Sequence, residues 1–286
     1  MLSVTPTLRP AGGLSRLAWG VSGVFAPGLV SADYGLPFPK PVTPVAERIL
    51  ELHNLVLLGC LAAFALVCGF MLYSLVMHRK GRGFKPARFR GHATLEALWP
   101  AVPFLALAGA AVPATKVLLE AADAGKPHMT VAITGYQWRW KYDYPVQDLS
   151  FFSSLATPRE QIEGGAPKDE RYLLEADNPL VLPVGLKVRF VITAHDVIHA
   201  WSVPQLGVKQ DAVPGFLGEF WASIDEPGTY RGQCAELCGV GHGYMPIVVQ
   251  AVTQEEFDLW VSGQKSNATV AARKGPGTNA AGAPRL

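Results

Sequence analysis

Charged residues are scarce in this chain. Asp, Glu, Lys and Arg make up only 17% of its 286 residues, whereas hydrophobic residues make up 49%. Soluble globular domains usually carry about 25% charged residues. The shortage of charge argues against an entirely water-soluble protein and directs the search to membrane-spanning segments.

Cysteine is also rare, and the sequence contains no Cys-x-x-Cys-His motif. That motif attaches haem c covalently, so its absence excludes a fused haem c domain. Of the four cysteines, Cys60 and Cys68 lie in an apolar run and are interpreted as small buried residues. Cys234 and Cys238 lie in a polar region four positions apart. The chain has no internal repeat.

Acidic residues are unevenly distributed along the chain. Residues 126–262 contain 17 acidic and 10 basic residues, whereas residues 263–286 contain four basic residues and no acidic one. An acidic soluble part argues against nucleic acid as a partner. It favours a basic protein partner, because opposite charges speed encounter. An acidic surface that only improves solubility explains the same balance equally well.

Two long apolar runs predict membrane helices at about 50–78 and 94–119. The first run, Leu52–Met77, holds 26 residues without a formal charge, more than the roughly 20 that cross a bilayer. The segment His78–Arg90 between the runs contains six Lys and Arg residues and no acid. Such short basic loops stay in the cytoplasm. We therefore expect a multi-pass protein of a bacterial inner membrane with both termini in the periplasm.

The remaining boundaries follow from composition. The expected segments are a signal peptide at 1–32 that is cleaved after Ala32, an extended segment and helical hairpin at 33–125, a periplasmic domain at 126–262, and a disordered tail at 263–286. A capping-box pattern at Thr253 predicts a short helix that ends near Trp260.

The periplasmic part has the pattern of a β protein. In Tyr136–Tyr144 every even position is aromatic and every odd position is polar, which predicts one strand with a packed face. Further strands are expected at Val131–Thr134, Leu180–Leu182, Lys187–Thr193, Phe216–Ile224 and Ile247–Val252. Many short strands separated by turns indicate a β-sandwich or barrel.

A metal centre is indicated by the segment Gly232–Pro246, which reads GQCAELCGVGHGYMP. The segment supplies two thiols, one imidazole and one thioether, and His199, which lies upstream, supplies a second imidazole. Soft sulfur combined with imidazole selects copper among first-row metals. Cys234 and Cys238 are then expected to bridge two copper ions. The capping and axial ligands would be His199, His242, Met245 and the carbonyl of Glu236.

The cysteine pair has two other interpretations. Cysteines in an exported domain often form a disulfide, but a disulfide requires neither the histidines nor Met245. A Cys2His2 zinc site is the second alternative, and the Met in a ligand position favours copper over zinc.

The same residues carry a family resemblance. GQCAELCGVGHGYMP, DVIHAWSVP, GVKQDAVPG and GYQWRWKYDY are similar to subunit II of the haem–copper cytochrome c oxidases, over roughly residues 42–260. The resemblance implies a two-helix transmembrane hairpin followed by a cupredoxin-like Greek-key β-barrel with a dinuclear copper (CuA) centre. Such a subunit takes electrons from cytochrome c and passes them to haem in subunit I of a proton-translocating oxidase of the respiratory chain. It does not reduce oxygen by itself.

The resemblance also implies roles for individual residues. The Glu236 side chain would reach a magnesium ion shared with subunit I, and Trp138 would be the point where electrons enter. Asp143, Asp177 and Asp196 match acidic positions that dock cytochrome c, and Glu96 matches a carboxylate at the mouth of a proton pathway. Arg139 and Phe152 depart from the family pattern and reduce the negative charge of the docking surface. A membrane-tethered copper carrier or assembly protein is the alternative function.

Overall fold

The computed structural model describes residues 39–83, 85, 91–122 and 125–273. The predicted signal peptide therefore lies outside the described residues. The same holds for part of the basic segment between the helices and for residues 274–286 of the predicted tail.

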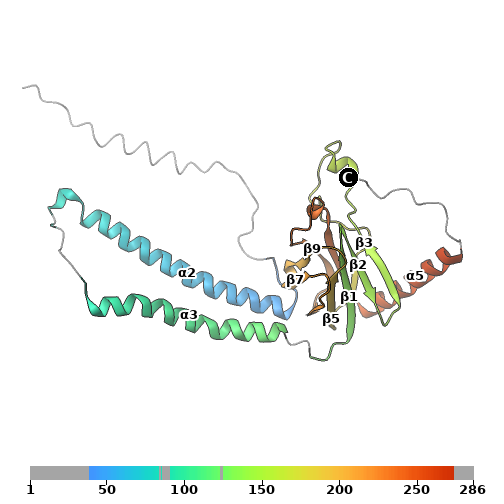
Figure 1. Ribbon diagram of the computed structural model, residues 1–286, viewed down its shortest axis with the longest axis horizontal. Coiled ribbons are helices and arrows are strands. Elements are labelled where there is room, and N and C mark those ends of the chain that lie inside the picture. The colour runs from blue at the N-terminus through green and yellow to red at the C-terminus, as the bar shows by residue number, and fades with distance from the viewer. Residues whose placement is uncertain (1–38, 84, 86–90, 123–124, 274–286) are drawn as a thin grey trace, which may run out of the picture. The chain divides into compact units, whose positions relative to one another are not determined.

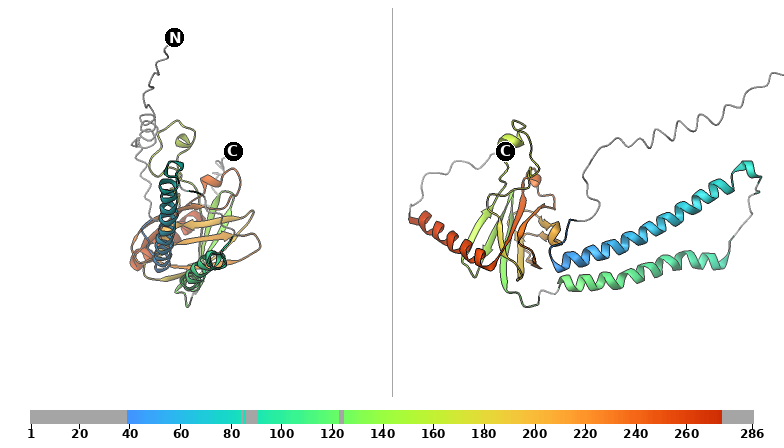
Figure 2. Two further views of the ribbon diagram at one scale, coloured as in Figure 1. Left: turned by 90° about the vertical axis from the view of Figure 1, so that its left-hand side faces the viewer. Right: turned by 180° about the vertical axis from the view of Figure 1, so that it is seen from behind.

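Two helices, α2 (Pro44–Met77) and α3 (Ala93–Ala122), lie side by side as a hairpin (Figure 1, Figure 2). The Thr43 hydroxyl caps α2 by accepting a hydrogen bond from the Ala46 N–H at 3.1 Å. Both helices are long and apolar enough to cross a bilayer. Large apolar side chains cover their outer surfaces, and none of the residues in the most apolar stretch of either helix is buried. Such surfaces require lipid or protein cover, so the chain is a membrane protein.

The described residues after α3 form two five-stranded sheets. The first, in the order β3-β2-β1-β5-β8, consists of β1 (Met129–Tyr136), β2 (Arg139–Tyr144), β3 (Leu149–Ser153), β5 (Lys187–Ala194) and β8 (Gly218–Ser223). The second, in the order β4-β10-β9-β6-β7, consists of β4 (Leu180–Pro183), β6 (His199–Val203), β7 (Val208–Ala212), β9 (Gly228–Cys234) and β10 (Pro246–Val252). β1 pairs with β5, and β4 with β10, in parallel. All other neighbouring strands are antiparallel.

The core lies between the two sheets. Residues of β1 and β5 alternate between buried and half-buried positions, so each strand turns one face inward. Large aromatic side chains fill the space, and the rings of Phe190 and Trp201 stack with centroids 5.9 Å apart. The predicted cupredoxin-like β fold behind a two-helix hairpin is confirmed.

The prediction of one strand from Tyr136 to Tyr144 is wrong. β1 ends at Tyr136 and β2 begins at Arg139, so Gln137 and Trp138 form the turn of a hairpin. Only Trp140, Tyr142 and Tyr144 of the five aromatic residues are fully buried. Tyr136 belongs to the half-buried set of β1, whose buried positions are the odd-numbered ones. The aromatic alternation therefore runs through one strand, a turn and a second strand.

The C-terminal helix α5 (Gln254–Arg273) begins with the predicted capping box. The Thr253 N–H donates to the Glu256 carboxylate at 2.9 Å, and the Glu256 N–H donates to the Thr253 hydroxyl. Phe257 and Trp260 pack against Tyr144 of the core. The helix continues beyond Trp260 to Arg273, so its predicted end is too early. Residues 263–273 are helical where a disordered tail was expected.

Strands β6 and β9 bring the candidate metal ligands together. Trp201 is opposite Cys234, and Ser202 is opposite Gln233. The close approach requires a glycine, because a Cβ on Gly232 would lie 1.9 Å from the Ser202 carbonyl oxygen. This contact sets the distance between the strand that carries His199 and the strand that ends in Cys234.

Gly232→Ala is therefore expected to push β6 away from β9. The free energy of unfolding should fall by about 1–3 kcal/mol, the usual cost of overpacking. Thermal unfolding of the full chain in detergent, followed by circular dichroism, measures the change. Gly243→Ala is the control, since nothing lies within 4 Å of a Cβ at that position. Equal stability of the two variants would contradict the proposed strain.

Candidate metal centre

The candidate ligands come from two neighbouring parts of the second sheet. His199 is the first residue of β6, and Cys234 is the last residue of β9. The connection from β9 to β10 supplies Cys238 and then His242, the first residue of the short helix η3 (His242–Tyr244). Met245 directly precedes β10. Pairing of β6 with β9 thus places a distant histidine beside a loop that holds the other ligands.

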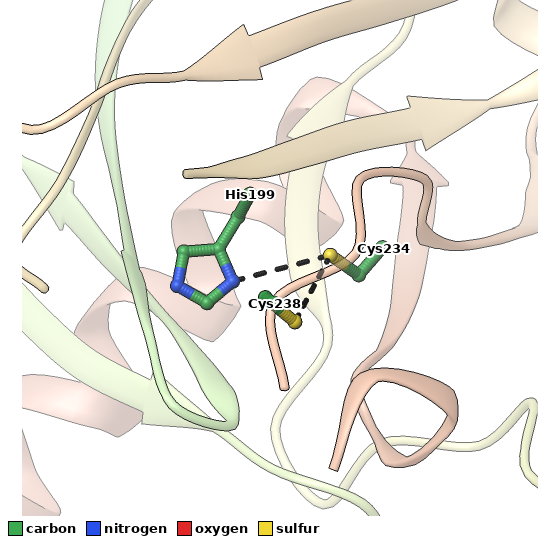
Figure 3. A group of neighbouring side chains, drawn as sticks. All are labelled: His199, Cys234 and Cys238. Carbon is green, nitrogen blue, oxygen red and sulfur yellow. Dashed lines mark hydrogen bonds between the residues drawn. The ribbon is translucent and has the colours of Figure 1, made fainter. Parts of the chain in front are cut away.

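The side chains form a continuous row in which two thiols lie between two imidazoles. Cys234 Sγ lies 3.8 Å from Cys238 Sγ and 3.9 Å from His199 Nδ1. Cys238 Sγ lies 3.5 Å from His242 Nδ1. Figure 3 shows His199 pointing at Cys234, with Cys238 beside both, since the ligand atoms of the three residues all lie within 4.8 Å of one another. Each cysteine sulfur therefore has an imidazole nitrogen within 4 Å.

A disulfide does not join the two cysteines. A disulfide requires about 2.05 Å between its sulfur atoms, and both cysteines are free thiols. His199, Cys234 and Cys238 are all buried and form the one group of metal-ligating side chains found among the described residues.

The donor set fits a soft metal. The Glu236 carbonyl oxygen lies 3.4 Å from Cys234 Sγ, and Met245 is buried beside the loop. Two sulfur atoms between two imidazoles, with a carbonyl and a thioether as weaker donors, match the preference of copper. A single tetrahedral zinc ion would leave Met245 without a function.

The two thiols differ in their acidity. Burial raises the pKa of Cys234, but the hydrogen bonds with His199, His242 and the backbone of Glu236 and Ala200 together outweigh burial and lower that pKa to about 6. Burial raises the pKa of Cys238, and the neighbouring Cys234 charge raises it further. Two thiolates this close repel one another, so a bound cation is needed to keep both deprotonated.

Asp196 binds the outer nitrogen of His199. Its carboxylate lies 2.9 Å from His199 Nε2 and also accepts hydrogen bonds from the N–H groups of Gln137 and Val197, both at 2.7 Å. Burial alone would raise the pKa of this carboxyl, but the hydrogen bond from His199 and those from the two N–H groups lower it overall. An N–H at Nε2 leaves Nδ1, on the thiol side, as the free ligand atom.

Gln137 and Trp138 hold the ligand loop from the other side. The side-chain amide of Gln137 and the indole N–H of Trp138 both donate to the Cys238 carbonyl, at 2.9 and 3.1 Å. The loop lies against the indole, because a Cβ on Gly241 would be 2.2 Å from a Trp138 ring atom. Sequence reasoning missed Gln137, whose contacts depend on the turn between β1 and β2.

The other sequence-predicted residues lie away from this row. Asp143 forms an ion pair with Lys141 at 2.8 Å. Asp177 accepts hydrogen bonds from the backbone N–H groups of Ser154 and Asn178, both at 2.7 Å. Glu96 is exposed in the first turn of α3. Asp196 is the only one of the three predicted docking acids that contacts a predicted ligand among the described residues.

Asp196→Asn is expected to lower copper affinity about 10- to 100-fold, the usual effect of losing the partner of a metal-binding histidine. Asparagine has one acceptor oxygen, and its NH2 group would face one of the N–H donors. Copper retention by the full chain against a chelator measures the effect. Asp143→Asn is the control, because that carboxylate contacts Lys141. Unchanged affinity in Asp196→Asn would show that Asp196 does not orient His199.

Known proteins resemble this chain over both of its parts. Residues 129–252 match the family described as cytochrome C oxidase subunit II, periplasmic domain, and residues 31–117 match its transmembrane domain. The probable cytochrome c oxidase subunit 2 of Rickettsia felis is 36% identical over 231 residues, which are 81% of this chain and 72% of the relative. The cytochrome c oxidase subunit 2 of Cereibacter sphaeroides is 36% identical over 241 residues, 79% of each chain.

A solved structure is also similar. The crystal structure of the periplasmic domain of subunit II of cytochrome oxidase from Bradyrhizobium japonicum shares 38% sequence identity. The match covers 51% of this chain and 99% of the Bradyrhizobium japonicum chain, with a TM-score of 0.46. The two family matches and the relatives settle the assignment. The chain, which is not catalytic on its own, belongs to the cytochrome c oxidase subunit II family and is part of a haem–copper oxidase complex, an oxidoreductase.

Proposed function

We propose that this chain is the subunit at which electrons enter the oxidase from cytochrome c, and that a dinuclear copper centre delivers them to haem in subunit I. The observation that carries the proposal is the row of two thiols, 3.8 Å apart, between two imidazoles. His199, Cys234, Cys238 and His242 would hold the copper, which when bound would supply a one-electron carrier whose charge is shared between two metals. The protein contributes the fixed positions of the ligands.

Preorganisation of the ligands comes from hydrogen bonds on both sides of the row. Asp196 orients His199, while Gln137 and Trp138 hold the Cys238 carbonyl. A ligand set that is already in place needs little rearrangement when the charge of the centre changes. Small rearrangement is what a rapid electron relay requires.

Trp138 is proposed as the contact for cytochrome c. It is partly exposed, and its indole is bonded to a ligand residue and packed on the ligand loop. It therefore reaches from the surface to the metal site. Asp143, Asp177 and Asp196 are the proposed docking acids, with Asp196 having the additional contact to His199.

The remaining assignments concern the complex and the membrane. We propose that both termini lie in the periplasm of a bacterial inner membrane, after cleavage of the signal peptide following Ala32. The Glu236 side chain, which is partly exposed, is proposed to bind a magnesium ion at the boundary with subunit I. Glu96 is proposed to lie at the entrance of a proton pathway. The basic segment between the helices supports the orientation.

Cys238→Ser tests the dinuclear assignment. A serine hydroxyl is a hard donor and cannot replace a bridging thiolate. Copper per chain should fall from about two to about one or none, with loss of the mixed-valence spectrum and of cytochrome c oxidation. Metal analysis and electron paramagnetic resonance of the purified oxidase make the measurement. Cys68→Ser is the control. Two coppers and normal turnover in Cys238→Ser would refute the proposal, whereas one labile Cu(I) in the native chain would indicate a copper carrier.

Trp138→Phe and Trp138→Ala test the site where electrons enter. Loss of a tryptophan at the centre of an interface costs about 2 kcal/mol or more, roughly 30-fold in kcat/KM for cytochrome c. Phenylalanine should retain part of that rate, and both variants should bind copper. Stopped-flow reduction by cytochrome c is compared with reduction by a small-molecule reductant. Equal slowing with both reductants would mean that Trp138 supports only the copper loop.

A further inference from the structure

A groove lies between the two membrane helices, where α2 begins and α3 ends (Figure 1). Its volume is about 280 Å³. Each helix contributes four residues at positions i, i+3, i+4 and i+7, which share one face of a helix. The lining residues are Arg48, Glu51, Leu52 and Leu55 from α2, and Pro113, Lys116, Val117 and Glu120 from α3. The groove therefore combines a charged part with an apolar part.

The charged part of the groove lies at the edge of the membrane-spanning segments. Arg48 and Glu51 precede the uncharged run Leu52–Met77. In α3, no formally charged residue lies between Glu96 and Lys116. Charged side chains at such a boundary reach the level of the lipid headgroups, and apolar side chains deeper in the helix contact the acyl chains. The groove therefore spans the boundary between headgroups and hydrocarbon.

Two carboxylates share the single guanidinium of Arg48. The guanidinium lies 2.9 Å from the Glu51 carboxylate and 3.8 Å from the Glu120 carboxylate. The second distance is too long for a hydrogen bond. Within the described part of the chain, the Glu120 carboxylate accepts no hydrogen bond, and 45% of its side chain is exposed. Glu120 can therefore accept hydrogen bonds from a bound molecule.

Lys116 supplies a free positive charge on the same face of α3. Its side chain is exposed and forms no hydrogen bond or ion pair with any residue that the structure describes. Lys116 and Glu120 are four positions apart, which is about 6 Å along the helix axis. The groove thus presents a free ammonium and an available carboxylate one helical turn apart, above an apolar floor. Its two basic and two acidic lining residues sum to zero charge.

We propose that this groove binds a phospholipid whose headgroup carries a primary amine, as phosphatidylethanolamine does. The phosphate accepts hydrogen bonds from Lys116, the ammonium donates to Glu120, and an acyl chain covers the apolar floor. An anionic lipid gains no net attraction from a neutral set of charges, and a quaternary amine has no N–H to donate to Glu120. The inference goes beyond the proposed function, because it involves neither copper nor cytochrome c.

A lipid in this groove would lie close to the start of α2, where the helix is attached to the β domain. The Thr43 hydroxyl, which caps α2, also donates to the Leu206 carbonyl at 2.8 Å. Arg48 lies little more than one turn further along the helix. A molecule that binds both α2 and α3 at this level stabilises the closed hairpin, because it binds the folded chain alone.

The test titrates the full chain in detergent with phosphatidylethanolamine, phosphatidylcholine and phosphatidylglycerol of the same acyl chains, and native mass spectrometry measures each affinity. The native chain should bind phosphatidylethanolamine most tightly. Lys116→Gln should weaken that binding about fivefold, the usual effect of one basic residue at a membrane surface. Glu120→Gln should abolish the preference for phosphatidylethanolamine over phosphatidylcholine, because the two headgroups differ only in the amine.

Lys80→Gln is the matched control. Lys80 begins the short helix η1 (Lys80–Arg82) at the other end of the hairpin, so the substitution removes the same charge at the opposite membrane boundary. Its lipid affinities should equal those of the native chain. Oxidase purified with its native lipids provides the second measurement, and the Lys116→Gln oxidase should retain less phosphatidylethanolamine than the native one.

Three results would overturn the inference. The native chain could bind all three lipids equally, or Lys80→Gln could weaken binding as much as Lys116→Gln does. The native and Lys116→Gln oxidases could also retain equal amounts of phosphatidylethanolamine, which would mean that another subunit covers the groove. Each leaves the proposed function intact, since copper content and cytochrome c oxidation should be unchanged in Lys116→Gln and Glu120→Gln.

Discussion

The close, unbonded approach of two thiols is the constraint on which the rest of the structure depends. Cys234 and Cys238 lie 3.8 Å apart, and neither belongs to a disulfide. Two acidic thiols at this distance resist double ionisation. The scaffold must therefore hold the thiols close together before a metal binds and leave their sulfur atoms free to bind it. The strand pair β6–β9 fixes one thiol beside His199, and the loop to β10 returns the second thiol to it. The β fold thus fixes the distance between the Cys234 and Cys238 sulfur atoms.

The helices, the β class and the candidate ligands of the β9–β10 loop could be predicted from the sequence because each is carried by local pattern. A 26-residue uncharged run and a basic loop are sufficient to predict a membrane hairpin. Cys234, Cys238 and His242 lie in one short segment, so their proximity requires no knowledge of the fold. The capping box at Thr253 is equally local, and it marks the correct start of α5.

The remaining features depend on contacts between distant segments, which no local pattern encodes. The aromatic alternation continued through the turn at Gln137 and Trp138, so the hairpin was mistaken for one strand. Asp196 was interpreted only as a docking acid because its contact with the Gln137 N–H requires the β1–β2 turn to meet the segment before β6. Arg139 and Phe152 were treated as separate departures, although strand pairing brings them into contact.

The position of Asp196 has a consequence for energy coupling between the surface and the buried centre. Its carboxylate is partly exposed, with 27% of the side chain accessible, while the imidazole that it holds is completely buried. A cation that binds this carboxylate would withdraw electron density from the group that supports His199. Thermodynamic reciprocity then requires that the oxidation state of the centre alter the affinity for whatever occupies that spot. A donor at that spot would therefore be held with a different affinity before and after the centre changes its charge.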